Sequence, residues 1–341
     1  MAERTLGVGI IGLGGIAFAH EAGYFEMGEV CRIVAMCDIR EEEAVSRAAM
    51  YDAKAYTRYQ DLLVDPAVDM VDIIVPHEKH YEIAVAALEA GKHVLVEKPI
   101  TASVDEGVRL LEKARLAKTK FSVAENTRFV TAYLKAEEIL ESGILGDIWT
   151  VRTLIAGSEV HRIKDPNLWH GKAPYGGVIL DSAVHNFYLF KWLFGGVRDV
   201  LGFASKILPE GEVEDNGLIL GHLENGAKYQ LNVSCTMEIP WTERVEIYGS
   251  RGGMIVDQLA NPVVKYYLGS NDIDGTVVDD VPFDPLGWKF ASMVEEIKDF
   301  VMAVIEDRPP LVDPADALYA LKAVEAVAQS IEHKQSINLY F

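Results

Sequence analysis

The chain has 341 residues, half of them hydrophobic and a quarter charged, which is the balance of a folded globular protein and not of a disordered one. Asp and Glu outnumber Lys and Arg by 52 to 32, and the formal net charge of −20 argues against binding to nucleic acid or to an anionic membrane surface. One anionic cofactor stays compatible with this charge, because backbone N–H groups at a helix start bind phosphate locally. The length predicts two domains.

The cysteines and the apolar runs bear on the compartment of the protein. Cys31, Cys37 and Cys235 lie in apolar surroundings without CxxC spacing, so we expect neither a disulfide framework nor a zinc site. Residues 1–5 lack the basic-then-apolar order of a signal peptide, and no run reaches the roughly 18–20 apolar residues of a membrane span. We therefore expect a cytoplasmic protein without a membrane partner.

Residues 1–125 alternate between short apolar runs and helix-like segments. Such alternation is typical of a parallel sheet with right-handed helical crossovers that cover both of its faces. The predicted strands are Leu6–Ile11, Ile33–Cys37, Met70–Val75, His93–Val96 and Phe121–Ala124, and the helices between them include Arg40–Tyr51, Lys79–Ala90 and Ser103–Ala117. The pattern predicts an α/β domain over residues 1–125.

Residues 126–341 follow a different pattern, in which polar and apolar residues alternate with a period of two. This period is typical of strands with one buried face. A helix is predicted at Ala132–Glu141, then strands at Trp149–Ala156, Gly217–His222, Ala227–Cys235, Arg244–Tyr248 and Val263–Leu268, and finally helices at Ala291–Glu306 and Pro314–His333. Asn225-Gly226, between two of the strands, is a strong hairpin signal. The pattern predicts an α+β domain with a mostly antiparallel sheet.

A glycine-rich turn directly follows the first predicted strand. Its sequence, Gly12-Leu13-Gly14-Gly15-Ile16-Ala17, has the spacing G-x-G-x-x-A. Gly12 permits a tight turn, Gly14 lets the backbone approach a pyrophosphate, and the small Ala17 lets a helix pack closely. Asp38 ends the second strand 21 residues after Ala17, where a carboxylate accepts the ribose hydroxyls. Together these features predict a dinucleotide site that includes Gly12, Gly14, Gly15, Ile16 and Asp38.

Asp38 also bears on which nicotinamide cofactor binds. A carboxylate at this position repels a 2′-phosphate and so favours NAD over NADP. Arg40 would weaken this preference if its guanidinium accommodated that phosphate, but it begins the acidic helix Arg40-Glu41-Glu42-Glu43 and is expected to be exposed. We therefore predict NAD as the cofactor, with Arg40 at the edge of its site.

Two further segments carry side chains suited to acid–base chemistry. The fourth strand ends in Glu97-Lys98-Pro99, and because open parallel sheets bind ligands at the carboxyl ends of their strands, we expect Lys98 near the nicotinamide. In the second half, GGVILDSAVH at Gly176–His185 places Asp181 four residues before His185, on one face of a helix. A carboxylate can orient an imidazole and raise its basicity, as a general base requires.

These motifs resemble those of the Gfo/Idh/MocA family, named from glucose–fructose oxidoreductase and inositol dehydrogenase. The similar segments are Gly12–Ala17, Asp38, AALEAGKHVLVEKP at Ala86–Pro99, Gly176–His185 and the closing helical segment from Asp313. The resemblance implies a Rossmann domain over residues 1–125 and a substrate and oligomerisation domain over 126–341 with a large open antiparallel sheet. It also implies hydride transfer between a nicotinamide and a carbon of a sugar or cyclitol.

The resemblance further implies roles for single residues. Lys98, Asp181 and His185 correspond to the catalytic set. The cofactor side is expected to include Pro76, His77, His80, Glu97 and Lys98, besides the glycine turn, Asp38 and Arg40. Many relatives have Asn at the position of His77 and Asp at that of Tyr188, so we expect atypical hydrogen bonding there.

The predicted reaction is the oxidation of a secondary alcohol. His185, oriented by Asp181, accepts the hydroxyl proton, and Lys98 donates to the same oxygen while a hydride passes to NAD. Either Lys98 or His185 can serve as the acid–base group once its pKa is tuned. We favour His185 as the base, because Lys98 beside Glu97 is expected to stay protonated.

A substrate wall is predicted from the residues that follow the fifth strand and from the loop His161–Tyr175. It is expected to include Asn126, Arg128, Phe129, Tyr133, Trp169 and His170, besides Asp181 and His185. Trp169 offers a flat apolar face to a sugar ring, although an ordinary half-buried loop Trp fits the pattern equally well. His161 and His170 lack ligand-like spacing, so no metal site is predicted.

The leading functional hypothesis is an NAD-dependent oxidoreductase that acts on a ring hydroxyl of a sugar or glycoside, with oxidation at C3 first among the positions. Inositol dehydrogenation is the next hypothesis. An NAD-dependent glycosidase with transient oxidation would release sugar without accumulating NADH. A non-catalytic NAD-sensing regulator would keep the Rossmann domain, but it would not need Lys98, Asp181 and His185 together.

Overall fold

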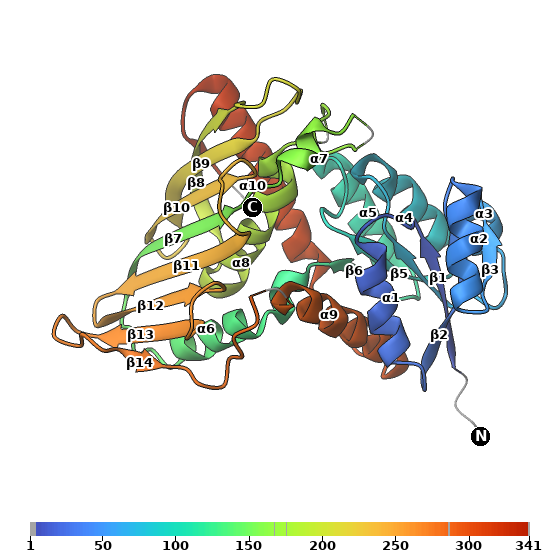
Figure 1. Ribbon diagram of the computed structural model, residues 1–341, viewed down its shortest axis with the longest axis horizontal. Coiled ribbons are helices and arrows are strands. Elements are labelled where there is room, and N and C mark those ends of the chain that lie inside the picture. Colours follow the sequence, from blue (N-terminus) through green and yellow to red (C-terminus); the bar gives the residue numbers. More distant parts are fainter. Residues whose placement is uncertain (1–4, 167, 175, 286, 340–341) are drawn as a thin grey trace. The chain divides into compact units, whose positions relative to one another are not determined.

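In a computed structural model, described for residues 5–166, 168–174, 176–285 and 287–339, the chain forms two compact units (Figure 1). The first unit contains the described residues up to Phe129 together with Lys289–Leu318, and the second contains Val130–Trp288 and the described residues from Tyr319 onward. Residues 1–4 and Tyr175, which entered the sequence analysis, lie outside the described residues.

A six-stranded parallel sheet forms the centre of the first unit. Its strands are β1 (Leu6–Ile11), β2 (Cys31–Cys37), β3 (Lys54–Tyr56), β4 (Met70–Ile73), β5 (His93–Glu97) and β6 (Phe121–Ala124), in the order β3-β2-β1-β4-β5-β6. The strand order reverses between β1 and β4, and open parallel sheets bind their ligands at such a point. The predicted Rossmann domain is confirmed, and β3 adds one strand to the five predicted.

Helices cover both faces of this sheet, with α1 and α9 on one side and α4 and α5 on the other (Figure 1). The helices are α1 (Ala17–Glu26), α2 (Glu41–Met50), α3 (Tyr59–Leu63), α4 (His80–Glu89), α5 (Val104–Leu116) and α9 (Trp288–Ile305), with 3-10 turns η1 (His77–Lys79) and η2 (Asn126–Phe129). The Ser103 hydroxyl caps α5 by accepting the N–H of Glu106, and Gly91, with a φ of 72°, follows the end of α4.

Helix α9 completes the core of the first unit. Ile297, Phe300 and Val301 are at most 1 % exposed and join the apolar cluster of β1, β2 and α1. Gly23 of α1 lies so close to this helix that a Cβ there would meet Ile297 at 2.7 Å. Residues 289–318 therefore belong to the first unit, whereas the sequence analysis grouped them with residues 126–341.

A nine-stranded mixed sheet forms the second unit, in the order β14-β13-β12-β11-β7-β10-β9-β8-β15. Its strands are β7 (Ile148–Ala156), β8 (Val197–Ser205), β9 (Asn216–Leu223), β10 (Lys228–Ser234), β11 (Thr242–Gly249), β12 (Gly252–Asp257), β13 (Val264–Leu268), β14 (Thr276–Val277) and β15 (Ile337–Asn338). Neighbouring strands are antiparallel except β7 and β10, which pair in parallel. The predicted mostly antiparallel sheet is confirmed, and β8, β12, β14 and β15 extend it.

Helices cover one face of the second sheet. They are α6 (Thr131–Glu141), α8 (Val184–Phe194) and α10 (Pro314–His333), which belongs to this unit from Tyr319 onward. A π-helical turn η3 (Ile179–Ala183) directly precedes α8, and the short helix α7 (Val160–Lys164) lies between β7 and η3 along the chain. In β11, Val245 and Ile247 are at most 1 % exposed, whereas Arg244 and Glu246 alternate with them on the more exposed face. None of the helices in the described part of the chain is both long and apolar enough to span a membrane.

Candidate functional site

The glycine turn after β1 has a backbone that only glycine fits at its first position. Gly12 has a φ of 94°, and a Cβ there would meet the carbonyl oxygen of Ile74 at 2.0 Å. Its N–H donates to the carbonyl of Cys37 at 2.8 Å, which ties the turn to the end of β2. Gly14 and Gly15 are exposed, and a Cβ on either would meet nothing within 4 Å. The outer side of the turn is therefore open, next to the first residues of α1.

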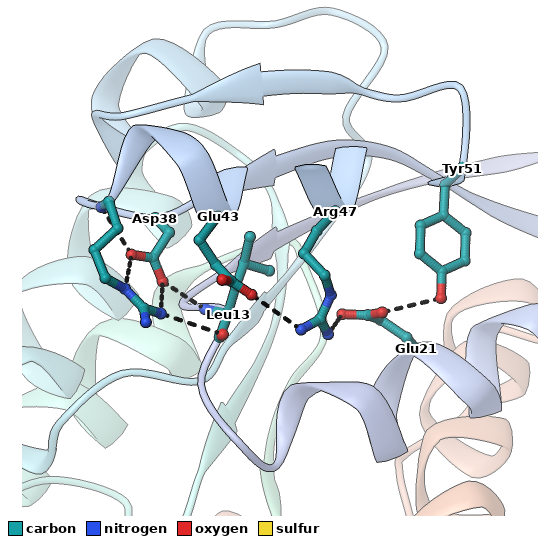
Figure 2. A network of polar contacts seen from close by, with 7 residues as sticks. Leu13, Glu21, Asp38, Glu43, Arg47 and Tyr51 are labelled. Carbon is teal, nitrogen blue, oxygen red and sulfur yellow. Dashed lines mark hydrogen bonds and ion pairs between the residues drawn. The ribbon is translucent and has the colours of Figure 1, made fainter. Parts of the chain in front are cut away.

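Asp38 lies directly after β2 and is anchored on this turn (Figure 2). Its Oδ2 accepts the backbone N–H of Leu13 at 3.0 Å, and its Oδ1 accepts the N–H and the Nε–H of Arg40, both at 2.9 Å. Burial opposes ionisation of Asp38, but the hydrogen bonds from Arg40 and Leu13 outweigh it and lower the pKa of Asp38. The side chain of Arg40, directly before α2, is 59 % exposed as predicted, and it forms an ion pair with Asp38.

A second polar network joins α1 to α2 beside Asp38, as Figure 2 shows. Arg47 of α2 contacts Glu43 and Glu21, and the Tyr51 hydroxyl donates to the other oxygen of Glu21 at 2.9 Å. These contacts hold the helix that follows the glycine turn against the helix that follows Asp38. They stabilise the packing of α1 against α2 beside the glycine turn and Asp38.

The segment from the end of β4 to the start of α4 contains three of the predicted cofactor-side residues. Pro76 is exposed, and the neighbouring His77 is 4 % exposed in the turn η1. His80 is fully buried, with Nδ1 2.8 Å from the carbonyl of Pro99 and Nε2 2.9 Å from that of Val75. Burial lowers the pKa of His80 more than these carbonyls raise it. His80 therefore links the loop after β4 to the loop after β5 from a fully buried position. This position does not fit direct contact with a cofactor.

Glu97 and Lys98 lie at the carboxyl end of β5. The Glu97 side chain is only 14 % exposed, its Oε2 accepts the backbone N–H of Lys98 at 2.9 Å, and its Oε1 lies 3.1 Å from Nε2 of His20. Burial opposes ionisation of Glu97, but the hydrogen bond and charge of His20 and the charge of Lys98 outweigh it and lower the pKa of Glu97. Glu97 thus points inward and holds the backbone from which the half-buried Lys98 side chain extends.

In the second unit, Asp181 and His185 lie on one helical segment that begins with the π turn. Asp181 belongs to η3 and is half-buried, and His185 lies in the first turn of α8 and is 8 % exposed. The predicted helix is confirmed from Val184 onward, but the first turn is wound as a π-helix instead of an α-helix. Wide turns of this kind are frequent at functional sites, because the extra residue re-aims the side chains that it carries.

Glu214 supports this π turn from the strand side. Its Oε1 accepts the N–H of Ile179 at 3.1 Å, and its carbonyl accepts the N–H of Val178 at 3.2 Å. Gly177 has a φ of 103°, and a Cβ there would meet Oε1 of Glu214 at 2.4 Å. Burial raises the pKa of Glu214. The glycine pair before Asp181 therefore makes room for a carboxyl group that satisfies the start of the helix.

The predicted substrate-side residues differ in their exposure. Tyr133 is 2 % exposed and lies beside Glu243 inside the second unit, which does not fit the predicted place on a substrate wall. Asn126 is 7 % exposed and donates from Nδ2 to Oγ of Ser292 at 2.8 Å, so its amide supports the turn η2.

The other predicted substrate-side residues remain partly exposed. Arg128 and Phe129 are partly exposed in the turn η2. Trp169 and His170 are half-buried and stacked on each other, with ring centroids 4.0 Å apart. No group of three or more His, Cys, Asp or Glu side chains among the residues that the structure describes is arranged to hold a metal.

Two family models match the sequence. The model of the oxidoreductase family with an NAD-binding Rossmann fold, Gfo/Idh/MocA, matches residues 6–125, and the model of the Gfo/Idh/MocA C-terminal domain matches residues 133–255. A D-xylose 1-dehydrogenase (NADP(+)) of Hypocrea jecorina is 30 % identical over 274 residues, which cover 72 % of this chain and 68 % of that protein. The chain belongs to the Gfo/Idh/MocA family.

Other family members match over nearly the full length. Myo-inositol 2-dehydrogenase of Thermotoga maritima is 27 % identical over 339 residues, covering 97 % of this chain and 98 % of that one. Two solved structures share the fold at 21 % identity. The WlbA dehydrogenase of Bordetella pertussis in complex with NADH and UDP-GlcNAcA has a TM-score of 0.90, with 100 % and 99 % of the two chains covered. A levoglucosan dehydrogenase in complex with NADH and levoglucosan has a TM-score of 0.89, with 99 % and 100 % covered.

The residues of this Gfo/Idh/MocA member fit a nicotinamide dinucleotide. The open space in front of Gly14 and Gly15 lets backbone N–H groups approach a pyrophosphate at the start of α1. The Asp38 carboxylate stands at the end of the neighbouring strand, where the family's fold brings a ribose. The first unit of this chain is thus an NAD-binding Rossmann domain.

The sequence analysis missed several buried polar groups around these residues. They are His20, Tyr24, Asp72 and Glu296; Glu214, which is partly buried, was missed as well. One signal was present in the sequence, since Asp72 interrupts the apolar run MVDIIV of a strand expected to be buried on both faces. A buried carboxylate requires a partner, so Asp72 by itself indicates a histidine or another donor that faces this strand.

Proposed function

We propose that the chain is an NAD-dependent dehydrogenase that transfers a hydride between the nicotinamide and a ring secondary alcohol of a sugar, glycoside or cyclitol. The observation that carries the proposal is the end of β5, where Glu97 holds the backbone of Lys98 at the carboxyl edge of an NAD-binding sheet. Asp181 and His185, on a supported π turn and helix, supply a carboxylate and an imidazole. A non-catalytic regulator that senses NAD would not need Lys98, Asp181 and His185 together.

In the proposed mechanism His185 accepts the proton of the substrate hydroxyl. Asp181, one turn earlier, orients the imidazole and favours its protonated form once the proton has arrived. Lys98 donates a hydrogen bond to the same oxygen and stabilises the charge that develops there. NAD, when bound, supplies the acceptor for the hydride that leaves the ring carbon.

NAD is proposed as the preferred cofactor over NADP. The support is the ionised Asp38, whose pKa is lowered and whose negative charge would repel a 2′-phosphate. Arg40 acts in the opposite sense, because its guanidinium partly neutralises Asp38 and is exposed to solvent. The D-xylose dehydrogenase relative is named for NADP(+), so the preference requires measurement in this chain.

Among substrates, oxidation of a pyranose or glycoside at C3 stays our first proposal. It is supported by the exposed parts of Trp169 and His170, a stacked aromatic pair suited to a sugar ring, and by the polar groups at the helix start. Inositol dehydrogenation is the second candidate. It is favoured by the match with myo-inositol 2-dehydrogenase over 97 % of this chain.

The assembly and the compartment are also proposals. We expect a homo-oligomer that covers the outer face of the second sheet, where Arg152 and Glu246 pair across β7 and β11 with 3.1 Å between them. A sedimentation experiment tests this expectation. We also expect a reducing, cytoplasmic setting, which agrees with Cys31, Cys37 and Cys235 as buried free thiols.

The proposed function is tested by a spectrophotometric screen for NADH. Purified protein is incubated with NAD and with myo-inositol, aldohexoses and methyl glycosides in turn, after any retained cofactor has been measured. NADH formation with one class identifies the substrate. Release of free sugar without NADH would favour a glycosidase with transient oxidation, and NAD binding without any turnover would favour a sensor.

A further inference from the structure

A histidine is buried between two carboxylates beneath the glycine turn. His20, on α1, is fully buried. Its Nδ1 lies 2.9 Å from Oδ2 of Asp72 on β4, and its Nε2 lies 3.1 Å from Oε1 of Glu97 on β5. Asp72 is fully buried as well, so this row of three residues runs from the middle of the sheet to the carboxyl end of β5.

Only one protonation state of His20 lets both of its ring nitrogens donate a hydrogen bond. Both ring nitrogens of His20 face carboxylate oxygens, which only accept, so only the doubly protonated imidazolium donates to both. Burial lowers the pKa of His20, but Asp72 and Glu97 outweigh it and raise that pKa well above 6.5. One positive ring between two negative groups is a charge arrangement that a buried site can hold.

The other ionisable groups around His20 fit this arrangement. The Tyr24 hydroxyl donates to Oδ2 of Asp72 at 2.9 Å, and burial raises the pKa of Tyr24 well above its ordinary value. Glu296 of α9 is 3 % exposed, and burial raises its pKa well above the ordinary value, so it keeps its proton to a higher pH than a free glutamic acid does. Other charged or titratable groups act on the row by their electrostatic interactions. Lys98 and His80 act on Glu97. Glu125 acts on Glu296, and Cys31 acts on Tyr24.

We propose that His20 and Asp72 are positioning residues for Lys98. Asp72 holds the imidazolium, the imidazolium holds the Glu97 carboxylate, and that carboxylate accepts the backbone N–H of Lys98 at 2.9 Å. The row fixes the direction in which Lys98 extends and keeps an anion beside it. This inference deepens the proposed function, since it rests on a catalytic role of Lys98.

Loss of the imidazolium has a consequence that depends on pH. Without its positive partner, Glu97 loses the contact that lowers its pKa and becomes protonated at a higher pH. A protonated Glu97 no longer places a negative charge beside Lys98. In His20→Gln the acid limb of the kcat profile therefore moves to higher pH, and kcat falls about tenfold for each pH unit below the new pKa. At alkaline pH, where Glu97 ionises again, most of the activity returns.

The kinetic experiment compares His20→Gln, Glu97→Gln and the double variant in the full chain, with kcat measured over pH with the substrate from the NADH screen. We expect the displaced acid limb in His20→Gln and no further loss when His20→Gln is added to Glu97→Gln, because both changes act through one carboxylate. An acid limb that stays in place, or losses that multiply in the double variant, would overturn the proposal. Asp72→Asn carries the same test if His20→Gln fails to fold.

Tyr24→Phe is the matched control. It removes a hydrogen bond to the same oxygen of Asp72 without altering the contact between His20 and Glu97. We expect lower stability and an unchanged acid limb. If Tyr24→Phe moved the acid limb as far as His20→Gln does, the effect would be general destabilisation, and the positioning role would be wrong.

A readout without turnover separates this inference from the proposed function. The chain has nine histidines, and 15N-histidine NMR of the NAD-free protein assigns His20 by its disappearance in His20→Gln. We expect His20 to stay doubly protonated at a pH well above the ordinary value of 6.5, where a free histidine is neutral. A neutral ring at that pH would overturn the inference even in an active enzyme. A protonated ring in a protein that oxidises no alcohol would instead contradict the proposed function.

Discussion

The backbone N–H of Leu13 donates to Oδ2 of Asp38 at 3.0 Å, across 25 positions of the chain. This bond fastens Asp38 to the glycine turn, so it joins the two parts of the proposed dinucleotide site. Oδ1 accepts the backbone N–H and the Nε–H of Arg40, and Oδ2 also accepts Nη2–H of Arg40 at 3.0 Å. The proposed preference for NAD therefore depends on a carboxylate that is anchored through both of its oxygens.

Replacement of Asp38 by Ser is expected to change cofactor preference. Loss of a hydrogen-bonded charge costs about 1.5–3 kcal/mol, so kcat/KM for NAD falls about tenfold to a hundredfold. The value for NADP does not fall, because the repulsion of a 2′-phosphate is lost with the carboxylate. Steady-state kinetics with both cofactors measures the ratio.

Arg40→Ala is the matched comparison for Asp38→Ser. It leaves the acid in place and removes the guanidinium that neutralises it, so the preference for NAD is expected to sharpen. An unchanged NAD to NADP ratio in both variants would contradict the role of Asp38 in discrimination.

Two glycines of the turn are expected to respond differently to alanine. Gly12→Ala places a Cβ 2.0 Å from the carbonyl oxygen of Ile74 at a φ of 94°, so we expect a loss of roughly 2–4 kcal/mol in the free energy of unfolding. Gly15→Ala meets nothing within 4 Å and should leave the unfolding free energy within about 0.5 kcal/mol. Urea titrations measure both values.

The same pair tests where the cofactor binds. Gly15→Ala fills the open side of the turn and is expected to weaken NAD binding in a folded protein, measured by calorimetry. Normal affinity for NAD in Gly15→Ala would contradict the placement of the pyrophosphate there.

The parts of the fold that depend on neighbouring residues could be predicted from the sequence. The turn at Gly12 follows directly from β1, and Asp38 follows from β2, so spacing along the chain was sufficient. Strand β8 escaped prediction because Gly202 interrupts its alternation, and that glycine is required by a helix far away in the sequence, where a Cβ would meet Val327 at 2.9 Å.

Glu296 is expected to make the stability of the protein fall as pH rises. Its pKa is raised well above 4.5 in the folded state, so above pH 4.5 the unfolded chain ionises while the folded chain keeps the proton. Folding stability is then lost with increasing pH, by at most about 1.4 kcal/mol per unit, until the pH passes the folded pKa. Glu296→Gln removes this dependence, and urea unfolding at several pH values between 5 and 8 measures it.

Glu295→Gln is the control for Glu296→Gln, because it changes the neighbouring residue, which is 57 % exposed and bonded to Lys298. Its effect should stay within about 0.5 kcal/mol and should not vary with pH over this range. If the wild type and Glu296→Gln lost stability with the same slope, Glu296 would not be a neutral buried acid.

His185→Ala is expected to lower kcat by a factor of about 10²–10⁴ and to leave the affinity for NAD unchanged. The physical reason is the loss of the group that accepts the hydroxyl proton. His222→Ala provides a histidine control in the same unit, since His222 is 41 % exposed and bonded to Asp199 at 3.0 Å. Hydride transfer that is unaltered across pH in His185→Ala would make the assignment of the base wrong.

The contacts that join distant segments could not be predicted from one sequence. His20 and Asp72 are 52 positions apart, and no local spacing pairs them. The π turn at Ile179–Ala183 depends on Glu214, which comes from a segment more than thirty positions later. Tyr133 looked like a wall residue because it follows the fifth strand, but it is buried beside Glu243, which comes later still.

The central claim is that a hydride leaves a ring carbon of the substrate and reduces NAD on this chain. It is tested most directly with methyl glucoside and with myo-inositol, each deuterated at all of its ring carbons and incubated with NAD and the protein. We predict that one of them yields NADH carrying one deuterium, detected by mass spectrometry, and that His185→Ala slows its formation. NADH without deuterium, or no NADH from any sugar, glycoside or cyclitol while NAD binds normally, would contradict the account.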